Sequence, residues 1–189
     1  ILGDPDSVSE LVMDVRDGMI PPEPFFVDIL VHSEIPGIDA AMADGAVNAE
    51  EEMRLPLALG AQQMLPERGE QALIDVLEDA DEATKIFAIE SFTERPSERS
   101  VAWLKRASKT GDTDVRTHAR MGMVALGLLP IGEALDALSS PDRDLRAWTV
   151  RCLTLATQNR SLPRHVIVAL QGAWRDESML VRLAATQAL

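Results

Sequence analysis

Three stretches of this sequence share one pattern: Asp112-Thr-Asp-Val-Arg-Thr-His-Ala119, Pro141-Asp-Arg-Asp-Leu-Arg-Ala-Trp-Thr149 and Asp176-Glu-Ser-Met-Leu-Val-Arg-Leu-Ala-Ala185. In each, acidic residues precede an apolar residue and a base, and a small residue follows three positions after the base. Looser copies surround Lys85 and Arg54. The bases lie at 54, 85, 116, 146 and 182, at intervals of 31, 31, 30 and 36 residues. Self-similarity at this period predicts a repeat protein.

Each base begins an amphipathic helix. Counted from Arg116, apolar or small residues fall at −1, +3, +7 and +10, which is one stripe of a helix: Val115, Ala119, Met123 and Leu126. The acids before each base suit the positive end of the helix dipole. A first helix is expected upstream of each turn, at 71–78, 100–109, 132–139 and 164–173.

The fold class that follows is all-α, a stack of about five helix pairs behind an irregular helical N-terminal cap. The predicted pairs span 37–65, 67–95, 97–127, 130–157 and 162–189, as one continuous domain. The cap, 1–36, contains expected helices at 7–17 and 25–34. Tyrosine is absent and aromatic residues make up 4% of the chain, which disfavours sheet.

Composition and charge restrict the class of protein further. No window approaches the roughly 18 apolar residues of a membrane span, so we expect no membrane segment in this chain. A single cysteine excludes an internal disulfide and favours a reducing, cytoplasmic location. The net charge of −13 is uneven. Residues 1–94 hold 22 acids and four bases, a balance of −18, and residues 95–189 hold nine acids and 14 bases, a balance of +5.

On these stretches the sequence resembles the HEAT repeat family, and is similar to the short bacterial repeats of the phycobilisome-lyase HEAT-like kind. The resemblance covers 67–189 well and 37–65 poorly. It implies a right-handed α-α superhelix, or armadillo-like solenoid. It does not choose a function, because the family includes transport receptors, scaffolds, bilin lyases, DNA glycosylases and a hydroxylase.

The resemblance also implies a ladder in which turn aspartates bind the helix-opening bases of neighbouring units. The matching residues are Asp79, Lys85, Arg116, Arg146, Asp176 and Arg182. The two middle units depart from this pattern, because their aspartates, Asp112 and Asp142, lie four residues before the base instead of six. We interpret these residues as structural.

No catalytic, cofactor or metal site is expected. Cys152 lies at a small-residue core position, where a thiol is usually inert. The three histidines are far apart in sequence and lack the repeated His-Glu pairs that a hydroxylase of this fold would need. The acidic run at 50–52 is interpreted as a solvated helix start. These observations argue against an enzyme.

The tryptophans leave an alternative open. Trp148 falls at +2 and is expected to fill the space between units, and Trp103 and Trp174 lie on or just after first helices. They are interpreted as core or half-buried. Alternatively, tryptophans and bases could line a groove for nucleic acid, although the acidic half opposes this. A bilin lyase or isomerase is the remaining enzyme alternative.

The predicted function is that of a non-catalytic scaffold or adaptor that binds a protein along the concave face. In a HEAT solenoid the second helices line this face, and their rows at +1, +4 and +5 should point into it. Apolar contacts are expected from Ile86, Ile89, Met121, Val150 and Leu183, and charged contacts from Glu90, Arg120 and Arg151. The partner of the basic C-terminal half should be an acidic protein segment.

Overall fold

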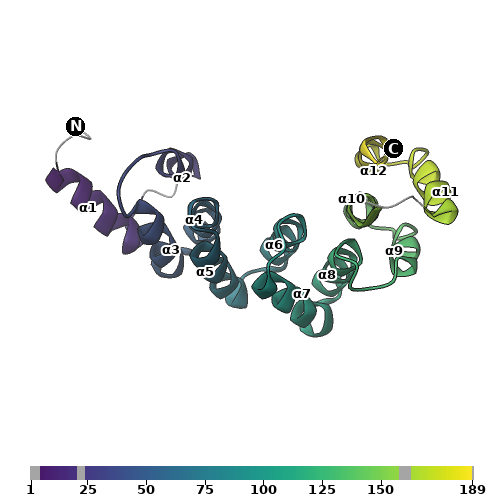
Figure 1. Ribbon diagram of the computed structural model, residues 1–189, viewed down its shortest axis with the longest axis horizontal. Helices are drawn as coiled ribbons and strands as arrows, with labels where there is room; N and C mark the ends of the chain where they lie inside the picture. The colour runs from purple at the N-terminus through teal and green to yellow at the C-terminus, as the bar shows by residue number, and fades with distance from the viewer. Residues whose placement is uncertain (1–4, 21–23, 158–162, 189) are drawn as a thin grey trace. The chain divides into compact units, whose positions relative to one another are not determined.

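The computed structural model describes residues 5–20, 24–157 and 163–188, and every regular element within these ranges is an α-helix (Figure 1). This confirms the all-α prediction. The chain divides into two compact units, residues 1–84 and 85–189, and the division falls inside one helix, α6. Each unit is considered separately below.

The N-terminal unit contains two rows of helices. In one row α1 packs on α3 and α3 on α5, and in the other α2 packs on α4. In the region expected to form an irregular cap, α1 and α2 thus each extend one of these two rows. The helices are α1 (Pro5–Arg16), α2 (Pro24–Val31), α3 (Ile38–Asn48), α4 (Glu51–Met64), α5 (Pro66–Asp79) and the start of α6 (Glu82–Glu94).

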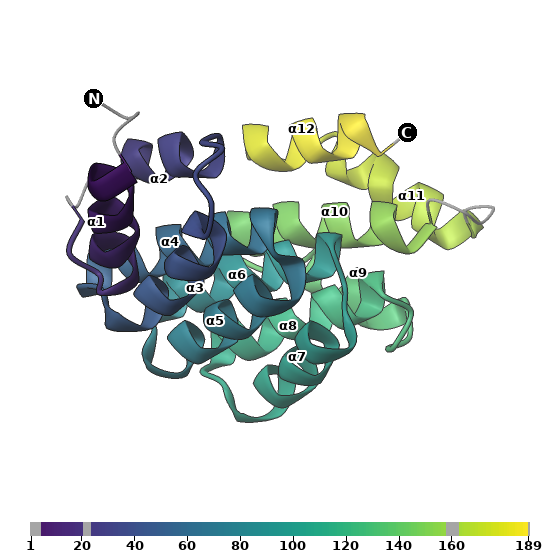
Figure 2. The same ribbon diagram turned by 60° about the vertical axis from the view of Figure 1, so that its left-hand side comes forward.

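The C-terminal unit repeats a helix-turn-helix arrangement. The second helices pack in succession, α8 on α10 and α10 on α12. The first helices of the pairs, α7, α9 and α11, lie together along one side of this row (Figures 1 and 2). Besides most of α6, the helices are α7 (Glu98–Thr110), α8 (Thr113–Ala125), α9 (Gly132–Ala137), α10 (Arg143–Thr157), α11 (Arg164–Ala173) and α12 (Met179–Gln187).

Local signals set several helix starts. Ser97 caps α7 in a capping box, since the Ser97 hydroxyl accepts from the backbone N–H of Ser100 and the Ser100 hydroxyl accepts from the backbone N–H of Ser97. The dipeptide Ser140-Pro141 is typical of a helix start, because serine caps a helix and proline suits its first turn, but α10 begins two residues later, at Arg143. The Ser140 hydroxyl accepts from the Asp142 N–H, and the Asp142 carboxylate accepts from the Asp144 N–H, so the turn is longer than expected.

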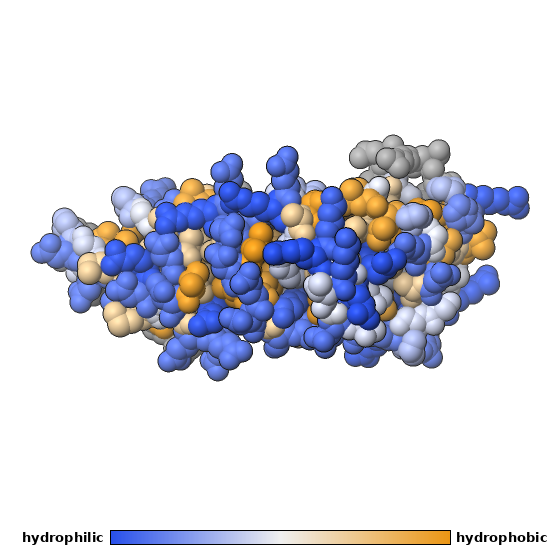
Figure 3. Space-filling model, turned by 90° about the horizontal axis from the view of Figure 1, so that it is seen from below, coloured by the Kyte–Doolittle hydropathy of each residue, from blue (hydrophilic) through white to orange (hydrophobic). Residues whose placement is uncertain are grey.

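The predicted stripe is the core of the repeat. On α8, Val115, Ala119 and Met123 are buried, and Leu126, just past the helix end, is half-buried. The flanking Gly122 allows α8 to approach α6 closely, because a Cβ at this position would lie 2.4 Å from Thr93 Oγ1. In contrast with this interior, hydrophilic residues cover most of the face drawn in Figure 3.

Candidate functional site

Four of the five repeated bases make the same contact, each within its own predicted helix pair. Each guanidinium donates to the backbone carbonyl five residues earlier, in the turn between the two helices of its pair. Such carbonyls would otherwise lack a partner at a helix junction. The bonds are Arg54 to Ala49 (3.0 Å), Arg116 to Gly111 (3.5 Å), Arg146 to Pro141 (3.1 Å) and Arg182 to Glu177 (2.8 Å).

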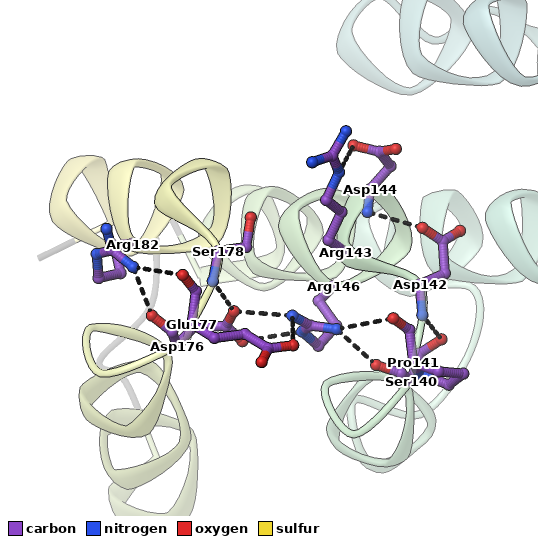
Figure 4. Close-up of polar contacts among 10 residues, drawn as sticks. All are labelled: Ser140, Pro141, Asp142, Arg143, Asp144, Arg146, Asp176, Glu177, Ser178 and Arg182. Atoms are coloured by element: carbon purple, nitrogen blue, oxygen red, sulfur yellow. Dashed lines mark hydrogen bonds and ion pairs between the residues drawn. The ribbon is translucent and has the colours of Figure 1, made fainter.

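One of these arginines also joins two successive helix pairs. Arg146 on α10 binds the carboxylate of Asp176, which lies before α12, through two bonds of 2.8 Å from Nε and Nη2 (Figure 4). The two side chains are only 7% and 14% exposed. This bidentate geometry is the strongest form of ion pair that arginine makes. It fixes the register between the last two helix pairs.

The pair shifts the protonation of both partners. The hydrogen bonds from Arg146, together with the Ser178 N–H, hold the pKa of the Asp176 carboxyl below its ordinary value, although burial opposes the shift. Correspondingly, the hydrogen bond to Asp176 raises the pKa of Arg146. Asp176 is therefore charged throughout the neutral and mildly acidic range.

The predicted ladder is thus continuous over one step only. Arg146 and Asp176 are brought together, and the Nη1 atom of Arg182 reaches the backbone carbonyls of Asp176 and Glu177. Among the described residues no ion pair or side-chain hydrogen bond includes Asp79 or Lys85, and Arg116 binds only its own turn. The resemblance to HEAT repeats predicts acidic partners for these bases. The bond that repeats is instead the one from the base to a backbone carbonyl of its own turn.

We expect Asp176→Asn to lower the stability of the C-terminal unit at neutral pH. Because the carboxyl pKa is lower in the folded than in the unfolded chain, its contribution is complete above the unfolded value of about 3.9 and is lost as pH falls through the folded value. The difference in urea midpoint between variant and wild type should therefore shrink towards about pH 3. Asp136→Asn, at an exposed position on α9, is the matched control. A difference that persists unchanged at low pH would contradict the role of this charge.

Two of the three charged residues expected on the second helices, Arg151 and Glu90, meet. Arg151 on α10 donates to Glu90 on α6 through a 3.0 Å bond and also binds Glu94. Its guanidinium carbon lies 5.4 Å from the centre of the Trp148 ring, within cation–π range. Arg120 on α8 pairs with Glu133 on α9 at 2.6 Å. Arg120 and Arg151 remain 45% and 43% exposed.

The expected apolar strip does not form. Ile89, Met121 and Val150 are buried, so they cannot offer surface to a partner. Gly122 on α8 lies against α6, since a Cβ there would approach Thr93 and Ile89, and α10 packs on α8, so contacts between second helices take up these rows. Ile86 is half-buried, and Leu183 on α12, 52% exposed, is the remaining large apolar side chain of this set at the surface.

The tryptophans and the cysteine are mainly core residues. Trp148 is 2% exposed and its Nε1 donates to the His118 carbonyl (3.2 Å), which confirms that it fills the space between units. Trp103 is buried and meets Phe92 edge to face, whereas Trp174 is exposed. Burial raises the pKa of the Cys152 thiol well above its ordinary value, which disfavours the nucleophilic thiolate.

An acidic depression in the N-terminal unit was not anticipated from the sequence. Its lining includes the run Glu50–Glu52 on one side and Asp79 and Asp81 on the other, with Arg54 among them. The run at 50–52 alone reads as a solvated helix start, and nothing in the spacing indicates that the turn before α6 lies opposite it. Within the described residues, no three histidine, cysteine or acidic side chains are grouped so that they could hold a metal ion.

Comparisons with known proteins do not add a family or a relative. No protein-family profile matches the chain, and curated proteins show no significant match to it. In the described part of the chain, every helix is too short or too polar to cross a membrane.

Proposed function

We propose that this chain is a HEAT-type repeat protein that binds another protein and does not itself catalyse a reaction. The binding surface we propose is formed by the second helices α6, α8 and α10 of the C-terminal unit, and the superhelix implied by the family resemblance would make this face concave. The observation that carries the proposal is the bridge from Arg151 to Glu90 and Glu94, which joins α10 to α6 across the row of second helices.

The bridge supports binding because it fixes charge on an exposed surface. Arg151 is held by two carboxylates and the Trp148 ring, so its orientation is restricted before any partner arrives. Pre-organised arginines lose less entropy on binding than free ones, and arginine is enriched among the residues that dominate interface energies. Arg120 on α8, paired with Glu133 on α9, is a second cation held by a carboxylate.

The chemistry of this surface indicates the partner. Residues 85–189 contain 15 bases and 11 acids, a balance of +4, whereas residues 1–84 contain three bases and 20 acids, a balance of −17. The acidic side chains of a partner protein could replace Glu90, Glu94 and Glu133 as the ion-pair partners of the two arginines. Apolar contact contributes less than the sequence predicts, because three of the five expected residues are buried.

Two further observations support the repeat assignment and the location. The arginine bond to the turn carbonyl recurs at Arg54, Arg116, Arg146 and Arg182, which is the structural counterpart of the sequence repeat. Cys152 is free and buried, and a cytoplasmic protein would carry such a thiol in reduced form.

We expect Arg120→Glu combined with Arg151→Glu to reduce capture of the partner from native lysate by more than about tenfold, as loss of hot-spot residues does. Reversal of the charge at Arg151 also breaks its ion pairs with Glu90 and Glu94. A second variant therefore exchanges the charges of all three residues, with Arg151→Glu, Glu90→Arg and Glu94→Arg, so that the ion pairs can still form. This variant restores the two ion pairs but not the cation over Trp148, so its unfolding midpoint should fall only slightly, and it should still lose the partner because the pattern of surface charge is inverted.

The matched control is Arg175→Glu, the same change of charge at an exposed position outside the surface. It should capture the same proteins as wild type, as identified by mass spectrometry. Retrieval of these proteins by both reversed variants would show that the second helices of the C-terminal unit do not form the binding surface.

A further inference from the structure

The exposed face of α7 carries a cluster of cations. Its charged residues are four bases and, in the first turn, one acid: Arg99, Lys105, Arg106, Lys109 and Glu98. Lys105 and Lys109 are one helical turn apart, so they lie on the same side of the helix. Among the described residues, the side chains of Lys105, Arg106 and Lys109 form no ion pair and no hydrogen bond, and these three residues are called the α7 cations below.

The bases of the second helices differ from the α7 cations, because each already has a partner in its own unit. Arg120 and Arg151 are paired with carboxylates. Arg146 holds the Asp176 carboxylate, and Arg116 binds its own turn. The charge of the α7 cations is therefore left for a group outside the C-terminal unit.

The acidic depression of the N-terminal unit, of about 800 Å³, has the opposite character. Its exposed acids are Glu50, Glu51, Glu52, Asp79 and Asp81. Within the described ranges, no ion pair includes the run at 50–52 or Asp79. Arg54, the base in the lining, donates from Nε to the Ala49 carbonyl (3.0 Å). The depression thus lacks a cation that would balance its acids.

The lining of the depression indicates which kind of cation it suits. Besides the acids it includes the apolar side chains of Leu55, Pro56 and Val76. A lysine side chain matches this combination, because its aliphatic stem can cover apolar surface while its charged head meets carboxylates. Lys105 and Lys109 present two such side chains from one face of α7.

We propose that the α7 cations of one copy of this chain dock into the acidic depression of a second copy. Charge complementarity selects this occupant, because the sequence itself carries both a depression that requires lysines and an exposed helix face that supplies them. The net charge of −13 opposes association at long range. At about 0.1 M salt, however, charges more than about 10 Å apart are largely screened, so the groups in contact decide.

The two surfaces are different, so the contact is heterologous. Each added copy brings a further depression and a further set of α7 cations, and association therefore continues beyond a dimer. Arg120 and Arg151 take no part in this contact, so self-association and capture of the partner proposed above can fail independently.

The association of the full chain can be measured by sedimentation equilibrium at about 0.1 M salt. We expect a weight-average mass that rises with protein concentration and returns to that of the monomer at about 0.5 M salt, since screening weakens exposed ion pairs. Lys105→Gln with Lys109→Gln should weaken association by roughly three- to tenfold, the combined effect of two exposed ion pairs. Glu51→Gln with Asp79→Asn should have a similar effect.

A mixture of these two double variants provides the decisive measurement. The first variant keeps its depression and the second keeps its α7 cations, so one intact contact can form between them. We expect a 1:1 complex that does not grow further, whereas each variant alone sediments nearly as a monomer.

The controls remove the same numbers of charges at exposed positions elsewhere. They are Arg164→Gln with Arg175→Gln on α11 and the turn after it, and Asp6→Asn with Glu10→Gln on α1. Both should associate like wild type. A wild-type chain that stays monomeric at about 0.1 M salt, controls that weaken association as much as the variants, or variants that form no complex when mixed would each overturn the proposal.

Discussion

Replacement of Trp148 by alanine should destabilise residues 85–189 by about 3–5 kcal/mol, the usual cost of deleting a buried aromatic side chain. Trp148 is one of the largest fully buried side chains, and its Nε1 donates to the His118 carbonyl on α8. The variant leaves a cavity between α8 and α10 and removes the ring beneath Arg151. Urea denaturation followed by circular dichroism at 222 nm would measure the loss, and hydrogen exchange would assign it to α8 and α10.

Trp174→Ala is the matched control, because Trp174 is 44% exposed and follows α11. The same chemical change there should cost less than about 1 kcal/mol, since a half-exposed side chain leaves no closed cavity. Equal losses in the two variants would show that Trp148 does not hold α8 and α10 together.

Replacement of Gly45 by alanine should destabilise the N-terminal unit by about 1–3 kcal/mol, the range for overpacking of a core. A Cβ at Gly45 would lie 2.0 Å from the carbonyl oxygen of Val15, so α1 must move away from α3. Because the obstacle is backbone and Val15 is fully buried, a change of rotamer cannot relieve the clash. We therefore expect the upper end of the range, with faster hydrogen exchange in α1.

Gly172→Ala makes the same change where space is open, because nothing lies within 4 Å of the added Cβ. This glycine is inside α11, and alanine favours a helix over glycine by roughly 0.5–1 kcal/mol. The control should be neutral or slightly stabilised. If Gly45→Ala behaved like Gly172→Ala, the close contact between α1 and α3 would not exist in solution.

Local features of the fold could be predicted from the sequence. The helix at 164–173 has the predicted bounds, since Pro163 precedes it and its apolar residues are periodic. The five bases mark the second helices correctly, because each lies in the first turn of its helix, and four of them, all but Lys85, bind the backbone of the preceding turn. Trp148 was placed correctly between units, because position +2 borders the buried stripe.

Features that depend on neighbours could not be predicted in this way. Periodicity shows on which side of its helix Ile89 or Val150 lies, but it does not show which side the neighbouring second helix covers. Both residues were therefore predicted to be at the surface, whereas they are buried. The bridge from Arg151 to Glu90 joins residues 61 positions apart, and no spacing rule connects them. The acidic lining around Asp79 likewise depends on how two turns face each other within the N-terminal unit.

The bond between each arginine and its own turn has a consequence for how such a chain changes length. Because Arg54, Arg116, Arg146 and Arg182 close turns within their own pairs, gain or loss of a pair by gene duplication or deletion would leave the remaining turns intact. The contact between Arg146 and Asp176, in contrast, recognises a particular neighbour. The number of helix pairs can therefore vary where each turn is closed by its own arginine. The order of the pairs is constrained where an aspartate of one pair must meet an arginine of the pair before it.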